Sequence, residues 1–190
     1  PVQTPAMPRS QSRKSNRIVL FGAIGGGALS LVVVLTLLLS GVFSSPGRVR
    51  VTVAWKNSEE NRLEPDEETI VVLAPAGVED DLKRMYAPPC RVEDVAEYRK
   101  ECEKKGGYVA TGRGGTVVIE NVKPGTYGLV IVSTKQGLYT DKAYLTRIKE
   151  QMKPYFNSIT LDTTTPTVAM HHVEEIQVRG GKETAVSHTF

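Results

Sequence analysis

The sequence contains little of the chemistry that most enzymes need. Its 190 residues include two cysteines, three histidines and one tryptophan, and aromatic residues make up 6% of the chain. The GxSxG, HExxH and P-loop signatures, which mark a nucleophile, a zinc site and a phosphate site, are all absent. No CxxC spacing indicates a metal or redox centre. We therefore expect a protein that is not an enzyme and that has no cofactor and no metal ion.

Charged residues are absent from one long stretch, residues 18–43, which reads IVLFGAIGGGALSLVVVLTLLLSGVF. At about 1.5 Å per residue, a helix of this length reaches roughly 39 Å, more than the ~30 Å hydrocarbon core of a membrane. The stretch is far longer than the apolar part of a signal peptide. We predict a single transmembrane helix. Late cleavage as a signal stays open, because small residues follow the stretch.

Acidic residues are absent from the first 17 residues, where all the charges are positive: Arg9, Arg13, Lys14 and Arg17. Positive flanks stay on the cytoplasmic side of a membrane helix. We therefore predict a disordered cytoplasmic tail over 1–17, a linker over 44–47 and an extracytoplasmic domain over 48–190. Because the excess positive charge is confined to this flank, no nucleic-acid partner is expected. The sequence begins at Pro1, which leaves open whether further residues precede it.

Small residues recur along the predicted transmembrane helix. Gly22 and Gly26 form a GxxxG motif that Ser30 extends, and Ala23 and Gly27 make a second pair of small residues four positions apart. Such pairs let two helix backbones approach closely. The motif favours a homodimer or a protein partner docked through this helix. A cluster without function is the alternative, since glycine is common in membrane helices.

The pattern after residue 47 is typical of a β-sandwich. Residues 48–55 alternate with period two, and 69–75 form a second strand that Pro75 ends. Two further strands flank Pro124-Gly125, where a type II turn would place Gly125 at positive φ. Because residues 127–132 are apolar on both sides, we predict a central strand in a two-layer packing. The chain closes with two strands, 171–179 and 182–190, that Gly180-Gly181 join into a hairpin.

Two segments have helical rather than strand periodicity. Residues 91–105 and 143–152 each place apolar side chains on one face, so both are predicted as short helices packed on the domain. The threonine-rich segment 158–165 is a strand or an extended loop.

Cys90 and Cys102 lie close to the two ends of the first predicted helix. Twelve residues of helix separate two Cα atoms by about 18 Å, whereas a disulfide requires about 4–7 Å. Either the helix breaks early or the thiols are free, and the pattern favours free thiols.

The segment GRGGTVVIENVKPGTYGLVIVS, with ETIVVLAP before it and VEEIQVRGGKETAVSHTF after it, resembles the carboxypeptidase regulatory-like, or transthyretin-like, domains. Their core pattern is matched here by Gly115, Ile119, Asn121, Val122, Pro124, Gly125, Tyr127 and Leu129. The resemblance implies a mainly β, Greek-key-like sandwich of about seven strands, with one or two short helical insertions in 77–107 and 135–168. It implies structural turn roles for Asn121, Pro124, Gly125 and Tyr127, and a non-catalytic module for spacing, adhesion or protein contact.

The three histidines are also candidate ligands for a metal site. His171 and His172 are adjacent, so on a strand they point to opposite faces and do not chelate one metal simply. His188 lies across the predicted hairpin, with Glu174 or Glu175 nearby. Exposed strand histidines are the favoured interpretation.

Three functions remain after these exclusions. The favoured hypothesis is a non-enzymatic, single-pass membrane protein whose β-sandwich binds or scaffolds other proteins outside the cytoplasm. The alternative is an accessory subunit of a larger membrane complex, docked through the small residues of its helix. A carbohydrate-binding module is the weakest hypothesis, because such sites use exposed aromatic residues and Trp55 is expected to face the core.

Overall fold

The computed structural model describes residues 45–57, 60–133, 141–164 and 169–190. By compactness the chain divides into Pro1–Phe43 and Ser44–Phe190, and all the described residues belong to the second unit. The predicted tail and transmembrane helix lie outside the described residues. Among the helices that are described, none is long and apolar enough to cross a membrane.

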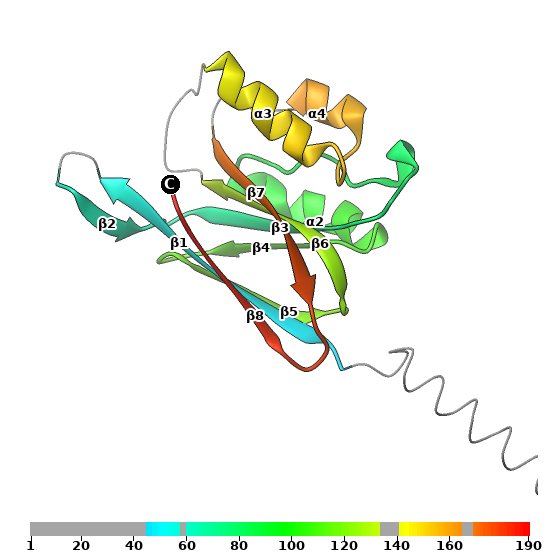
Figure 1. The fold of residues 1–190 in the computed structure, drawn as a ribbon, viewed down its shortest axis with the longest axis horizontal. Coiled ribbons are helices and arrows are strands. Elements are labelled where there is room, and N and C mark those ends of the chain that lie inside the picture. The colour runs from blue at the N-terminus through cyan, green and yellow to red at the C-terminus, as the bar shows by residue number, and fades with distance from the viewer. Residues whose placement is uncertain (1–44, 58–59, 134–140, 165–168) are drawn as a thin grey trace, which may run out of the picture. The chain divides into compact units, whose positions relative to one another are not determined.

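Within these described residues, eight strands form two four-stranded sheets (Figure 1). In the first sheet, β1 (Gly47–Asn57) pairs antiparallel with β2 (Arg62–Pro65) and β5 (Thr116–Val122), and parallel with β8 (Glu183–Thr189). The second sheet is antiparallel throughout, in the order β4 (Tyr108–Gly112), β3 (Thr69–Pro75), β6 (Gly125–Ser133) and β7 (Met170–Val178). The predicted mainly β, sandwich-like fold is confirmed, with eight strands rather than about seven.

The predicted hairpin of the last two strands is wrong. β7 belongs to the second sheet and β8 to the first, so the chain crosses between the sheets at Gly180-Gly181. The reason is that β1 offers β8 a partner edge along seven residues, Arg48–Ala54. The apolar side of β8, through Val186, packs on the core between the sheets. Local turn chemistry indicated the reversal of the chain correctly but not the pairing partner.

The connection from β5 to β6 also differs from the prediction. Gly125 does not have positive φ; the left-handed residue is Asn121, with φ of 58°. Two tyrosines hold the crossing: the Tyr127 hydroxyl donates to the Lys123 carbonyl, and the Lys123 N–H donates to the Tyr108 hydroxyl, both at 2.9 Å. The turn is therefore fixed by side chains from two strands, and no type II turn forms at Pro124-Gly125.

Helices cover the outer face of the second sheet and make a third layer (Figure 1). They are α2 (Val95–Lys104), α3 (Lys142–Met152) and α4 (Ser158–Thr164), with single 3-10 turns η1 (Asp81–Lys83) and η2 (Val92–Asp94). The first two helices confirm the predicted ones. The strand or loop expected at 158–165 is wrong, because Asn157 starts a helix there: its Oδ1 accepts the Thr160 N–H at 3.2 Å.

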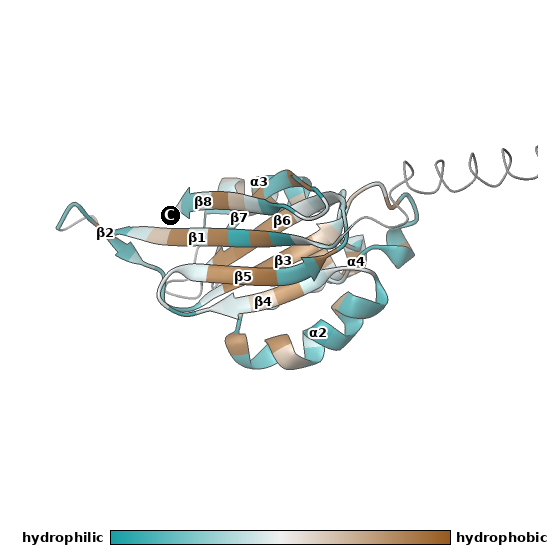
Figure 2. Cartoon of the chain, turned by 90° about the horizontal axis from the view of Figure 1, so that it is seen from below, coloured by the Kyte–Doolittle hydropathy of each residue, from teal (hydrophilic) through white to brown (hydrophobic). Residues whose placement is uncertain are grey.

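Two hydrophobic cores follow from this arrangement. One lies between the sheets, and the other lies between the second sheet and the helices. Residues Thr69–Ala74 of β3 and Tyr127–Ser133 of β6 are therefore buried on both faces. β6 is central as predicted, but its second apolar face packs on helices, so the packing has three layers and not two. Figure 2 shows the alternating hydropathy of β1, whose burial also alternates, and the apolar run of β5 that ends at Glu120 and Asn121.

Candidate functional site

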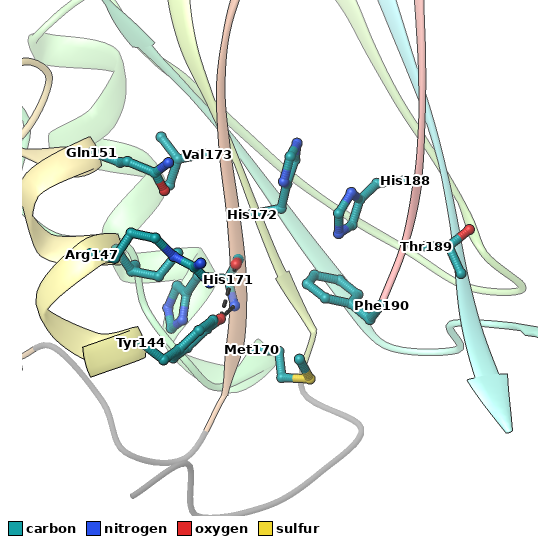
Figure 3. A pocket seen from close by; sticks show the side chains of 11 residues that line it. Tyr144, Arg147, Gln151, Met170, His171, His172, Val173, His188, Thr189 and Phe190 are labelled. Atoms are coloured by element: carbon teal, nitrogen blue, oxygen red, sulfur yellow. Dashed lines mark hydrogen bonds between the residues drawn. The ribbon is translucent and has the colours of Figure 1, made fainter. Parts of the chain in front are cut away.

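A groove of about 380 Å³ runs along the free edge of β7, between α3 and the end of β8 (Figure 3). Its walls come from segments far apart in the chain: Tyr144, Arg147 and Gln151 of α3, residues 170–173 of β7, and residues 188–190 at the chain end. Asp141 begins α3 by accepting the Ala143 N–H at 2.9 Å. Since Ile148 and Met152 anchor α3 in the core, its neighbouring face is presented to the groove.

Tyr144 joins α3 to the edge strand. Its hydroxyl accepts the His171 N–H at 2.7 Å and donates to the His171 carbonyl at 3.0 Å (Figure 3). The guanidinium of Arg147 lies over the Tyr144 ring, 5.6 Å from its centroid. Among the described residues that line the groove, Arg147 is the only Lys, Arg, Asp or Glu. The groove therefore combines one positive charge with aromatic and neutral polar groups.

His171 points to the helix side of β7 and is 4% exposed. Burial lowers the pKa of its imidazole to about 4. The nearby Ala169 carbonyl raises the pKa and so offsets part of this decrease. It does not form a well-aligned hydrogen bond with either ring nitrogen. The imidazole is therefore neutral at pH 7 and has no hydrogen-bond partner within the described residues.

This buried imidazole should make stability depend on pH. Between its ordinary pKa of about 6.5 and its folded-state pKa of about 4, the unfolded chain binds more protons. The free energy of unfolding should therefore fall as the pH is lowered through this window, by about 3 kcal/mol from His171, with no further loss from this group below pH 4. Urea unfolding at pH 7, 5.5 and 4.5 measures the slope. His171→Gln should remove the His171 share of the slope, while His188, whose pKa is also lowered to about 4, keeps its own share; an unchanged slope would contradict the assignment.

His172 points the opposite way, as predicted, and meets His188 on β8. The two rings stack with centroids 3.8 Å apart and an interplanar angle of 16°, and Phe190 packs edge-on against His188 at 4.5 Å. Burial and, to a smaller extent, the neighbouring His172 lower the pKa of His188 to about 4. Trp55, which is half-buried, extends the aromatic row with its ring 6.3 Å from that of Phe190.

The histidine pair is not arranged as a metal site. Imidazole lone pairs lie in the ring plane, so two nearly parallel rings do not direct both lone pairs at one point. His172 Nε2 lies 3.9 Å from Glu174 Oε1, the nearest carboxylate contact. In the described part of the chain, no group of three or more His, Cys, Asp or Glu side chains is placed to hold a metal ion.

Cys90 and Cys102 are both free, which confirms the predicted thiols. Burial raises the pKa of each thiol, to about 12, with a smaller contribution from Asp94 at Cys90 and from Glu103 at Cys102. Since the thiolate is the reactive form, neither cysteine is suited to nucleophilic chemistry near neutral pH.

The sequence prediction and the structure select different residues. Gly22, Ala23, Gly26, Gly27 and Ser30 lie outside the described residues, so their helix-packing role stays a prediction. Tyr144, Arg147 and Gln151 had no assigned role beyond the amphipathic pattern of 143–152. Their spacing of three to four residues on one helix face was the only available signal, and it does not say which strand the helix meets.

Comparisons with known proteins leave the family open. No protein-family profile matches the chain, and no curated protein matches its sequence. Among solved structures, a proposed carbohydrate-binding protein from Pseudomonas aeruginosa is similar with a TM-score of 0.39 and 14% identity, over 77% of this chain and 90% of that one. Similarity this low carries no conclusion about the function of this chain.

Proposed function

We propose that this chain is a non-enzymatic, membrane-anchored binding and scaffolding protein. Residues 18–43 span the membrane once, the basic tail stays in the cytoplasm, and the sandwich of residues 48–190 binds a protein partner on the other side. The observation that carries the binding role is the groove between α3, β7 and β8, which three elements build and to which Arg147 contributes a positive charge. The charge-free stretch and its positive flank support the anchor.

The titration behaviour of the domain supports a role without catalysis. General bases work best with a pKa near the working pH. His171 and His188 have pKa values of about 4, and both thiols have pKa values of about 12. These groups are therefore poorly suited to moving protons or attacking a substrate at neutral pH.

We also propose kinship with the carboxypeptidase regulatory-like sandwiches. The two-sheet core and the order of its strand segments support this assignment. The helical third layer extends the minimal form of that fold, and it supplies one wall of the groove.

The topology is tested by protease protection of the full chain in spheroplasts. Protease added outside should digest the sandwich and leave the tail, tagged at the N-terminus, protected by the membrane. Digestion of the domain only after the cells are lysed would place it in the cytoplasm and contradict the proposal.

The alternative is an accessory subunit of a larger membrane complex, which the small-residue pairs of residues 22–30 favour. Gly22→Leu combined with Gly26→Leu separates the two functions. If the sandwich binds the partner, the partner should stay bound in blue-native electrophoresis; loss of the partner would favour the helix as the docking element. Thr36→Leu, which lies in the same stretch but outside the motif, is the matched control.

A further inference from the structure

β7 is an edge strand, and its main chain is open on one side. The N–H and the carbonyl of His171 both form hydrogen bonds with the Tyr144 hydroxyl, so these main-chain groups point away from β6. In an antiparallel ladder, successive residues point their N–H and carbonyl groups alternately toward the paired strand and away from it. The main-chain groups of Val173, Glu175 and Gln177 therefore face the same free edge as those of His171. The Thr184 hydroxyl donates to the Gln177 carbonyl at 3.3 Å, which agrees with this parity.

Between these two closed points lies a short open segment. Tyr144 occupies the edge at His171, and Thr184 occupies the carbonyl of Gln177. The N–H and carbonyl groups of Val173 and Glu175 have no partner on this side among the residues that the structure describes. They repeat about every 7 Å along the strand, which is the spacing of a β-ladder. A ligand that satisfies them must itself have alternating donors and acceptors at that spacing.

The walls of the groove suit the side chains of such a ligand. Successive side chains of an extended peptide point to opposite sides. On one side of β7 stand Arg147 and Gln151 of α3, and on the other stand His188 and Phe190 (Figure 3). Arg147 has no carboxylate partner within the described part of the chain and contacts the Tyr144 ring instead. The walls are therefore complementary to an acidic side chain on the α3 side and an apolar one on the β8 side.

We propose that β7 binds an extended peptide by strand addition, with the main chain of Val173 and Glu175 forming the ladder. A carboxylate of the peptide pairs with Arg147, and an apolar side chain packs against Phe190. This inference rests on the proposed function and names the chemistry of its partner: a segment of another polypeptide in β conformation. Main-chain hydrogen bonds supply affinity in such binding, and the alternate side chains supply specificity.

The first test uses a phage library of random linear heptapeptides, panned on the detergent-solubilised full chain. Enriched sequences should carry Asp or Glu alternating with apolar residues, and are then made as fluorescein-labelled peptides for anisotropy titration. Val173→Pro removes one outward N–H and should weaken peptide binding at least tenfold. The fold itself should tolerate this proline, because the N–H of Val173 is not used in pairing with β6. Arg147→Gln should weaken binding at least threefold and reduce its dependence on salt.

The matched control for the proline is Ala185→Pro on β8. The main-chain groups of Phe190 form hydrogen bonds with β1. Because Ala185 is an odd number of residues away along the same strand, its N–H points away from β1, just as the N–H of Val173 points away from β6. Ala185 does not line the groove. Peptide affinity should change less than twofold in this variant. Equal loss in both proline variants would assign the effect to general damage and overturn the proposal.

Amide exchange tests the same ladder without any substitution. In the full chain without peptide, the Val173 and Glu175 amides should exchange far faster than the Glu174 amide, and saturating peptide should slow both at least tenfold. Failure to enrich any peptide, or enrichment of peptides that leave these two amides unchanged, would overturn strand addition. If the native partner still binds Val173→Pro, strand addition is wrong while the proposed function stands.

Discussion

Phe156→Ala should lower the free energy of unfolding by about 3–5 kcal/mol, the usual cost of emptying a large buried aromatic site. Phe156 is 0% exposed and belongs to the core between the second sheet and the helices. It follows α3 and bridges to Met85, whose carbonyl accepts the Asn157 N–H at 2.7 Å. Urea unfolding followed by circular dichroism measures the loss.

This substitution tests whether the helices are part of the folding unit. Ile159→Ala on α4 is the control, since its side chain is 63% exposed and its removal should cost less than about 0.5 kcal/mol. A loss below 1 kcal/mol for Phe156→Ala would show that the helical layer is a loosely attached decoration. α3 would then be an unreliable wall for the groove.

Gly115→Ala should cost about 3 kcal/mol or more, while Gly114→Ala next to it should cost about 1 kcal/mol. Both residues have positive φ, 76° and 69°, so both variants carry backbone strain. They differ in space: a Cβ on Gly115 would lie 2.7 Å from the Val53 carbonyl oxygen and 2.8 Å from Pro65, whereas Gly114 has nothing within 4 Å.

The difference in stability loss between the two variants measures the cost of a side chain where β1 and the turn before β5 approach closely. The Val53 N–H donates to the Gly115 carbonyl at 2.7 Å, so β1 and the turn before β5 are held together at this point. A side chain there must push them apart. Thermal unfolding of both variants measures the difference, and equal costs would mean that the turn yields freely.

Much of the fold could be predicted because the signals are local. The alternation of Val49, Val51 and Val53 gave β1, the apolar run 69–75 gave β3, and helical periodicity gave α2 and α3. Each signal depends on whether neighbouring residues face water or the core. Apolar residues on both sides of β6 indicated full burial correctly, but that pattern does not distinguish a sheet from a helix as the covering layer.

The site could not be predicted, because it depends on pairings distant in sequence. β8 pairs with β1 across more than 130 residues, and the Gly180-Gly181 turn is equally compatible with a hairpin. Only this pairing places His188 against His172 and Phe190 at the groove. The helix at 158–164 was missed because its threonines have low helix propensity, while the Asn157 cap and the buried Leu161 stabilise it.

Blue-native electrophoresis of the mildly solubilised full chain, with mass spectrometry of the band, tests the central claim most directly. The expected result is a band larger than one or two protomers that contains a second, defined polypeptide. That companion should persist in the Gly22→Leu, Gly26→Leu double variant and be lost or weakened in Arg147→Gln. A band that holds this chain alone, at one or two protomers, would contradict a binding and scaffolding role.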